Sequence, residues 1–97
     1  MTQPTILERV KEMTRYALER EAEKILALDV VKERISEAAK GGFNRLTVAP
    51  DKPLDLSQTT VAKATAAALR GEGFTMEWEV RLQPDSISYR VLIVNWA

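Results

Sequence analysis

Apolar residues recur at helical spacing through the first 40 residues of the chain. Their separations of three, four and seven positions place them on one face of a helix. The face comprises Leu7, Val10, Ala17, Leu18, Ala22, Ile25, Leu28, Ile35 and Ala38. Thr5 and Glu8, at its start, have the spacing of a capping box. The pattern therefore predicts a helical region over residues 1–40.

The predicted helix is long for a chain of 97 residues. At 1.5 Å per residue, a helix of roughly 35 residues would run about 50 Å. A compact domain of this size has a radius of gyration of only about 12 to 13 Å. The helix therefore either breaks near Asp29, which could cap a second segment, or projects and packs on another subunit. The sequence leaves both outcomes open.

A strand and another helix follow this region. Gly41-Gly42 ends the first helical region, because glycine readily takes the left-handed conformation found at helix C-termini. Residues 43–48 predict the first strand. The next helix, capped by Asp55 or Ser57, is expected to run to about Arg70.

Alternating apolar and polar residues mark the end of the chain. They predict a strand over residues 74–82 and a return strand over residues 87–96, joined by a turn at Pro84-Asp85. A turn centred there fixes the pairing of the two strands. It sets Leu82 opposite Ile87, Val80 opposite Tyr89, Trp78 opposite Val91, Met76 opposite Ile93 and Glu79 opposite Arg90.

The last strand is apolar on both faces beyond Arg90, which is typical of a central strand that is covered on each side. Placing it between the other two strands gives the order 1-3-2. We therefore predict an α+β fold, with the long N-terminal helix followed by β-α-β-β and a three-stranded, mainly antiparallel sheet. The helix between the strands would cover one sheet face, and the long helix or a second subunit the other. We expect a single domain over residues 1–97, with a βαββ core over residues 43–97.

Composition removes several kinds of chemistry. Fourteen Lys and Arg balance fourteen Asp and Glu, so neither nucleic acid nor an anionic membrane is the expected partner. The chain has no histidine, the commonest general base and a common metal ligand. It also has no cysteine, the usual thiol nucleophile and another metal ligand. No apolar run reaches the roughly 20 residues of a membrane span, and no signal-peptide pattern is present. We expect a non-enzymatic cytoplasmic protein, in the host cytoplasm if viral, with no metal or cofactor.

Leu92, Val94 and Trp96 form the candidate interface. Tryptophan is enriched at protein interfaces, where it acts as an anchor. If the N-terminal helix covers these three residues, they belong to the core. If that helix projects, they are free to contact a second subunit.

Arg81, Tyr89 and Arg90 are the candidate ligand contacts, for a small ligand such as a nucleotide bound at a subunit interface. Guanidinium groups pair with phosphates, and an aromatic ring can stack on a base. Glu77 and Glu79 are the nearest approach to a carboxylate pair. Because nothing in the sequence places them in a desolvated pocket, we interpret them as surface charges beside Arg81 and Arg90.

The segments "EAAKGGF", "LRGEGFTMEWEV" and "YRVLIVNW" give the chain the layout of a family of small phage proteins. The chain resembles the small, uncharacterised α+β accessory proteins of tailed bacteriophages over residues 20 to 97. That resemblance implies a factor that binds a host protein, sequesters a small signalling nucleotide or assembles into particles. Our leading hypothesis is a homo-oligomeric interaction protein. The alternatives are a nucleotide-binding protein and, after it, a nucleic-acid-binding module.

Overall fold

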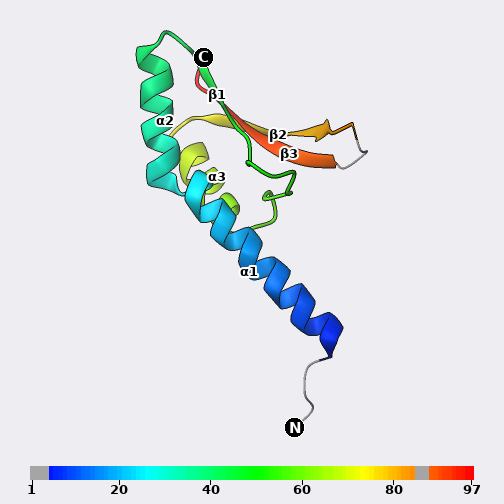
Figure 1. Ribbon diagram of the computed structural model, residues 1–97. Helices are drawn as coiled ribbons and strands as arrows, with labels where there is room; N and C mark the ends of the chain where they lie inside the picture. The colour runs from blue at the N-terminus through cyan, green and yellow to red at the C-terminus, as the bar shows by residue number, and fades with distance from the viewer. Residues whose placement is uncertain (1–4, 85–87) are drawn as a thin grey trace.

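The computed structural model describes residues 5–84 and 88–97 and confirms the predicted α+β class (Figure 1). Three helices and three strands make up its described part. Their order is α1 (Ile6–Leu26), α2 (Leu28–Lys40), β1 (Arg45–Val48), α3 (Thr60–Gly71), β2 (Thr75–Leu82) and β3 (Ser88–Asn95).

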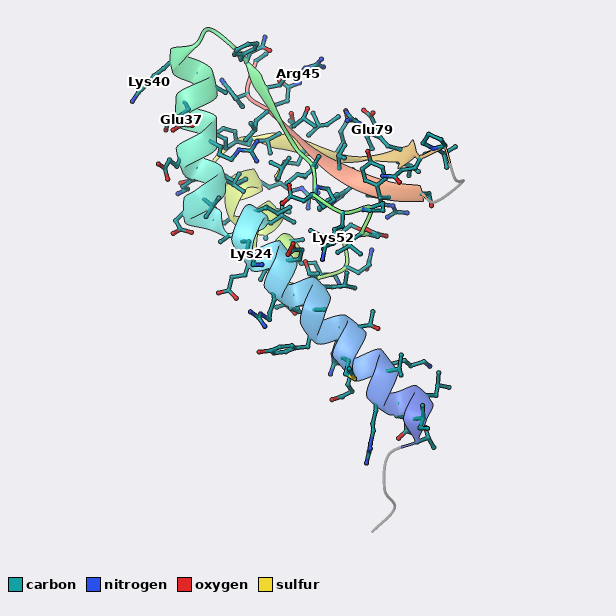
Figure 2. The ribbon with its side chains drawn as sticks, viewed as in Figure 1. Lys24, Glu37, Lys40, Arg45, Lys52 and Glu79 are labelled. Atoms are coloured by element: carbon teal, nitrogen blue, oxygen red, sulfur yellow. The ribbon has the colours of Figure 1, made fainter. Side chains whose placement is uncertain are left out.

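The long helical region both breaks and projects, while its packing on another subunit stays a prediction. The break lies at Ala27, whose backbone is extended at φ −56° and ψ 141°, and not at Asp29, which lies in the first turn of α2. Beyond the break α2 runs on at an angle to α1, away from the N-terminus, while the N-terminal part of α1 leaves the folded body (Figure 1). The side chains of residues 6–17 in this part are exposed (Figure 2). The resulting radius of gyration is 15.6 Å, above the value of about 12.5 Å expected for a compact domain of this length.

The sheet has the predicted order β1-β3-β2, and β3 pairs antiparallel with both neighbours. The predicted pairing of β2 with β3 is wrong by one residue. Leu82 lies opposite Ser88, and the other pairs follow as Val80 with Arg90, Trp78 with Leu92 and Met76 with Val94. The connection is one residue longer than the predicted turn, and connection length sets the register of a hairpin. Asp85 of that turn and Ile87 lie outside the described residues.

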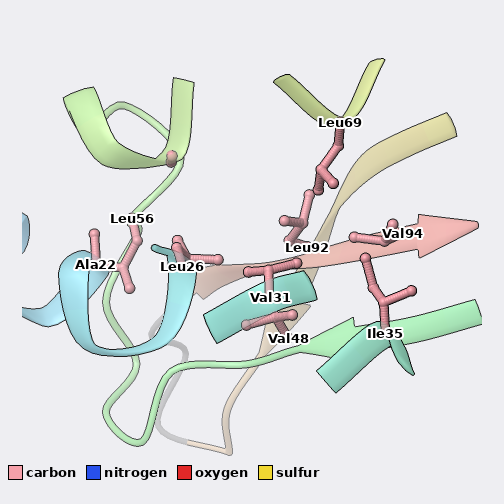
Figure 3. Close-up of a cluster of buried hydrophobic side chains, with 10 residues drawn as sticks. Ala22, Leu26, Val31, Ile35, Val48, Leu56, Leu69, Leu92 and Val94 are labelled. Carbon is pink, nitrogen blue, oxygen red and sulfur yellow. The ribbon is translucent and has the colours of Figure 1, made fainter. Parts of the chain in front are cut away.

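The core lies between the helices and one face of the sheet. It joins Ala22 and Leu26 of α1, Val31 and Ile35 of α2, Ala62 and Leu69 of α3, Val48, Leu92 and Val94 of the sheet and Leu56 (Figure 3). Because α1, α2 and α3 all pack against this face, the prediction that the long helix covers the opposite face is wrong. On that opposite face Val91 and Ile93 are buried between Thr47, Glu77 and Glu79 of the neighbouring strands.

Local sequence signals fix the helix ends. The predicted capping box at the start of α1 is present, with reciprocal hydrogen bonds between Thr5 and Glu8. Gly42 and Gly73 stand just past α2 and α3 in the left-handed region, at φ 90° and 100°, which confirms the predicted stop at Gly41-Gly42 and shows the same device after α3. The predicted cap of α3 is wrong: Thr59, and neither Asp55 nor Ser57, accepts the capping hydrogen bond, from Ala62 N–H at 3.1 Å.

Candidate interaction surface

A row of exposed apolar side chains runs along the projecting part of α1. We call it the α1 stripe, and it consists of Ile6, Leu7, Val10, Met13 and Ala17. The first four side chains are 80%, 62%, 51% and 70% exposed, and Ala17 is exposed as well. Ile6, Val10, Met13 and Ala17 are separated by four, three and four residues, the spacing that keeps side chains on one side of a helix. The stripe is therefore a continuous apolar surface on an element that the rest of the chain does not cover.

Mixed charges surround the α1 stripe. Glu8 and Glu12 alternate along the helix with Arg9, Lys11 and Arg15, and Arg15 bonds Glu12 at 3.1 Å. A surface of this kind suits neither a polyanion nor an anionic membrane, because each would need a clear excess of positive charge. An apolar stripe bordered by both signs of charge is typical of a helix that packs on another protein.

Glu19 attaches the projecting helix to α3. Its carboxylate accepts hydrogen bonds from the backbone N–H groups of Thr60 at 2.6 Å and Val61 at 3.5 Å. These groups stand at the start of α3, where no intrahelical acceptor is available. The hydrogen bond from the Thr60 backbone, followed by the contact with Val61, lowers the pKa of the Glu19 carboxyl below its usual value despite partial desolvation.

Thr65 of α3 fixes the second attachment, at the helix break. Thr65 is 3% exposed, and its hydroxyl donates to the carbonyl oxygen of Leu26 at 2.6 Å. That carbonyl lies at the end of α1, where it has lost its helical partner. The bond therefore holds the end of α1 against α3 and orients the projecting half.

A cleft of about 420 Å³ lies where α1 leaves the body. Val10, Thr14 and Leu18 line it from α1, and Gln58 and Thr59 line it from the segment that leads into α3. Val10 belongs to both the α1 stripe and the cleft. The apolar surface of α1 thus continues from its exposed end into this cleft.

The structure does not place the predicted interface residues on a free surface. Leu92 and Val94 are 1% and 0% exposed, and both lie in the core beneath the helices. Trp96 is half-buried and meets Phe74 edge to face at 6.2 Å between ring centroids. Of the two alternatives for these residues, the structure gives the core. The helix nevertheless projects, because α2 and α3 cover the sheet without the N-terminal half of α1.

The predicted ligand residues do not meet. Arg81 and Tyr89 lie opposite each other on the sheet face away from the helices, whereas Arg90 alternates with Tyr89 onto the helix side. Arg81 bonds Glu79 at 3.2 Å, and Arg90 approaches Asp55 at 4.0 Å. A single chain therefore does not bring the three residues together on one face, and the nucleotide site expected at a subunit interface stays a prediction.

The α1 stripe is the site that the sequence analysis identified only in part. The helical face predicted from the sequence includes Leu7, Val10 and Ala17 but leaves out Ile6 and Met13. Their spacing from Val10, of four and three residues, is the signal that could have added them. Within residues 5–84 and 88–97, no cluster of three or more acidic side chains is arranged to hold a metal ion. Across the same residues, every helix is too short or too polar to span a bilayer.

Comparisons with known proteins match nothing: no protein-family model, no curated protein and no solved structure is similar to this chain.

Proposed function

We propose that this chain is a non-enzymatic interaction protein that associates with itself through the α1 stripe. One observation carries the proposal: four large apolar side chains lie exposed in a row on a helix that leaves the folded body. Fully burying a side chain of this size is favourable by about 1.5–3 kcal/mol. Contiguous exposed apolar patches rimmed by polar residues mark interaction sites on otherwise polar surfaces.

The stability of the projecting helix supports the same proposal. Residues 6–17 gain little from packing within the chain, since their side chains are exposed. Isolated helices shorter than about 12–15 residues are marginal in water, and most helical stability in proteins comes from burying an apolar face. A second copy packed on the α1 stripe would supply that burial. The resemblance to phage accessory factors, some of which assemble into particles, fits this class of function.

The test is sedimentation velocity over a loading series from about 1 μM to about 1 mM, which covers association free energies of roughly −8 to −4 kcal/mol. We expect the wild-type protein to associate reversibly within that range. Val10→Glu places a charge in the α1 stripe and should keep the protein monomeric throughout, because an unpaired charge would be buried at the contact.

Val80→Glu is the matched control, because Val80 is 57% exposed on β2 and Val10 is 51% exposed on α1. It should associate as the wild type does, and circular dichroism should show native helix content in both variants. A wild-type protein that is still monomeric at the top of the series would refute the proposal. If Val10→Glu and Val80→Glu weakened self-association equally, the contact would not lie on the α1 stripe.

A further inference from the structure

We propose that two copies pair through the α1 stripe in antiparallel orientation, with the two-fold axis between Val10 and Met13. This inference rests on the proposed self-association and adds the geometry of the contact. In this register Val10 packs on Met13 of the second copy, and Ile6 packs on Ala17 of the second copy. Each residue number and that of its partner sum to 23.

The spacing and sizes of the stripe residues fit this register. The separations of four, three and four residues read the same in both directions, so an antiparallel copy presents a side chain at every level where the first copy does. Each level then joins a larger side chain with a smaller one, Ile6 with Ala17 and Met13 with Val10. A parallel pair would join Ile6 with Ile6 and Ala17 with Ala17, which crowds one end and leaves a gap at the other.

Charges further along α1 oppose the parallel arrangement. Arg20 and Lys24 stand three and seven residues after Ala17, so they continue the line of the α1 stripe toward the folded body, and both are exposed. A parallel pair would stack Arg20 on Arg20 and Lys24 on Lys24 of the second copy. Like charges at facing positions destabilise helix pairs and select against that orientation. The antiparallel register leaves both residues beyond the described start of the partner's helix.

A cation–π contact adds to the antiparallel arrangement. Arg9 and Tyr16 flank the α1 stripe on the same side, seven residues apart. Antiparallel pairing brings Arg9 of one copy on the same side as Tyr16 of the other, offset by two residues or about 3 Å along the axis, twice in the dimer. Tyr16 already accepts such a contact within the chain, where the Arg20 guanidinium lies 5.8 Å from its ring centroid.

The position of the cleft completes the geometry. In the antiparallel register Ile6 of the second copy arrives at the level of Ala17, one residue before Leu18, which lines the cleft beside α3. The two folded bodies then lie at opposite ends of the paired helices, since the body of each chain is reached only at the far end of α1 (Figure 1). The contact is small beside a standard interface of about 800 Å² per partner, so a weak, reversible dimer is expected.

Single cysteines test the orientation, because the chain has none of its own. Ile6→Cys and Ala17→Cys are prepared separately and mildly oxidised alone and as an equal mixture. The antiparallel register separates like positions by 11 residues, or about 16 Å along the axis, whereas a disulfide needs Cα atoms within about 7 Å. Only the mixture should therefore form the disulfide-linked dimer, at least about ten-fold above either variant alone.

Glu12→Cys mixed with Ala17→Cys is the control, because Glu12 is exposed on the side of α1 away from the stripe. That mixture should give no more cross-linking than random collision. Efficient cross-linking of Ile6→Cys alone would show a parallel pair and overturn the orientation while leaving self-association intact. A protein that sediments as a monomer would overturn the proposed function and this inference together.

Discussion

The two halves of α1 belong to one regular helix but have opposite surroundings. In the second half Ala22 and Leu26 are 0% and 1% exposed, packed against α2, α3 and the sheet. In the first half Ile6 and Met13 are 80% and 70% exposed. Both halves carry apolar residues at helical spacing. The comparison shows that periodicity establishes the helix, whereas the fold decides which side of it is covered from within. The line of the α1 stripe continues into exposed Arg20 and Lys24, and the buried Ala22 and Leu26 lie on another side of the helix.

The largest expected effect is the difference in unfolding free energy between two leucine truncations, one in each half of α1. Leu26→Ala removes a fully buried side chain and should lower the free energy of unfolding by about 3 kcal/mol, through lost burial and the cavity left behind. Leu7→Ala, at a position 62% exposed, should change it by no more than about 0.5 kcal/mol. Urea titration followed by circular dichroism, at a concentration where the protein is monomeric, measures both.

Leu7→Ala should instead weaken association, because Leu7 belongs to the α1 stripe. The contrast between the halves would disappear if the two substitutions destabilised the monomer equally. That result would mean that the projecting half packs on the body in solution.

The hydrogen bond at the break should give the next largest effect. Thr65→Val keeps the shape of the side chain but removes the hydroxyl that donates to the Leu26 carbonyl. The buried carbonyl then lacks a partner, which should cost about 1–2 kcal/mol of unfolding free energy. Thr65→Ser retains the donor and serves as the control in the same urea titration. Equal losses in the two variants would assign the effect to the missing methyl group and not to the hydrogen bond.

Local sequence predicted this break to within two residues but not the residue at which it occurs. Asp29 is the better capping residue and Ala27 a good helix former, yet the helix breaks at Ala27. The hydroxyl that satisfies the freed carbonyl comes from Thr65, which is 39 residues away from Leu26 in the chain. A tertiary contact of this kind leaves no mark in the sequence around the break.

The fold was predictable where local chemistry decides it. Gly42 and Gly73 end helices because each needs a positive φ, and the doubly apolar run from Val91 to Val94 indicates the central strand. The hairpin register was not predictable, because a difference of one residue in the connection exchanges the two faces of β3. That exchange placed Leu92 and Val94 in the core beneath the helices and Tyr89 on the sheet face away from the helices.

The smallest expected effect is a pH dependence at the junction between the two halves. The backbone hydrogen bond from Thr60 lowers the pKa of the Glu19 carboxyl below that of the unfolded chain. Its contribution to stability is therefore fully present above the ordinary glutamate pKa of about 4.3, and is lost as the pH falls through the lowered pKa of the folded state. Glu19→Gln should accordingly be less stable than wild type near pH 7 and equal to it once Glu19 is protonated.

Urea midpoints of wild type and Glu19→Gln between about pH 7 and pH 3 measure this convergence. Glu12→Gln is the matched control in the projecting half, where the carboxylate contacts only the exposed Arg15 side chain at 3.1 Å. Exposed pairs of this kind contribute little to stability, so Glu12→Gln should track the wild type across the range. A constant difference between wild type and Glu19→Gln at every pH would show that the ionised carboxylate does not hold α1 on α3. The orientation of the projecting half would then depend on the Thr65 bond and the packing of Leu26 alone.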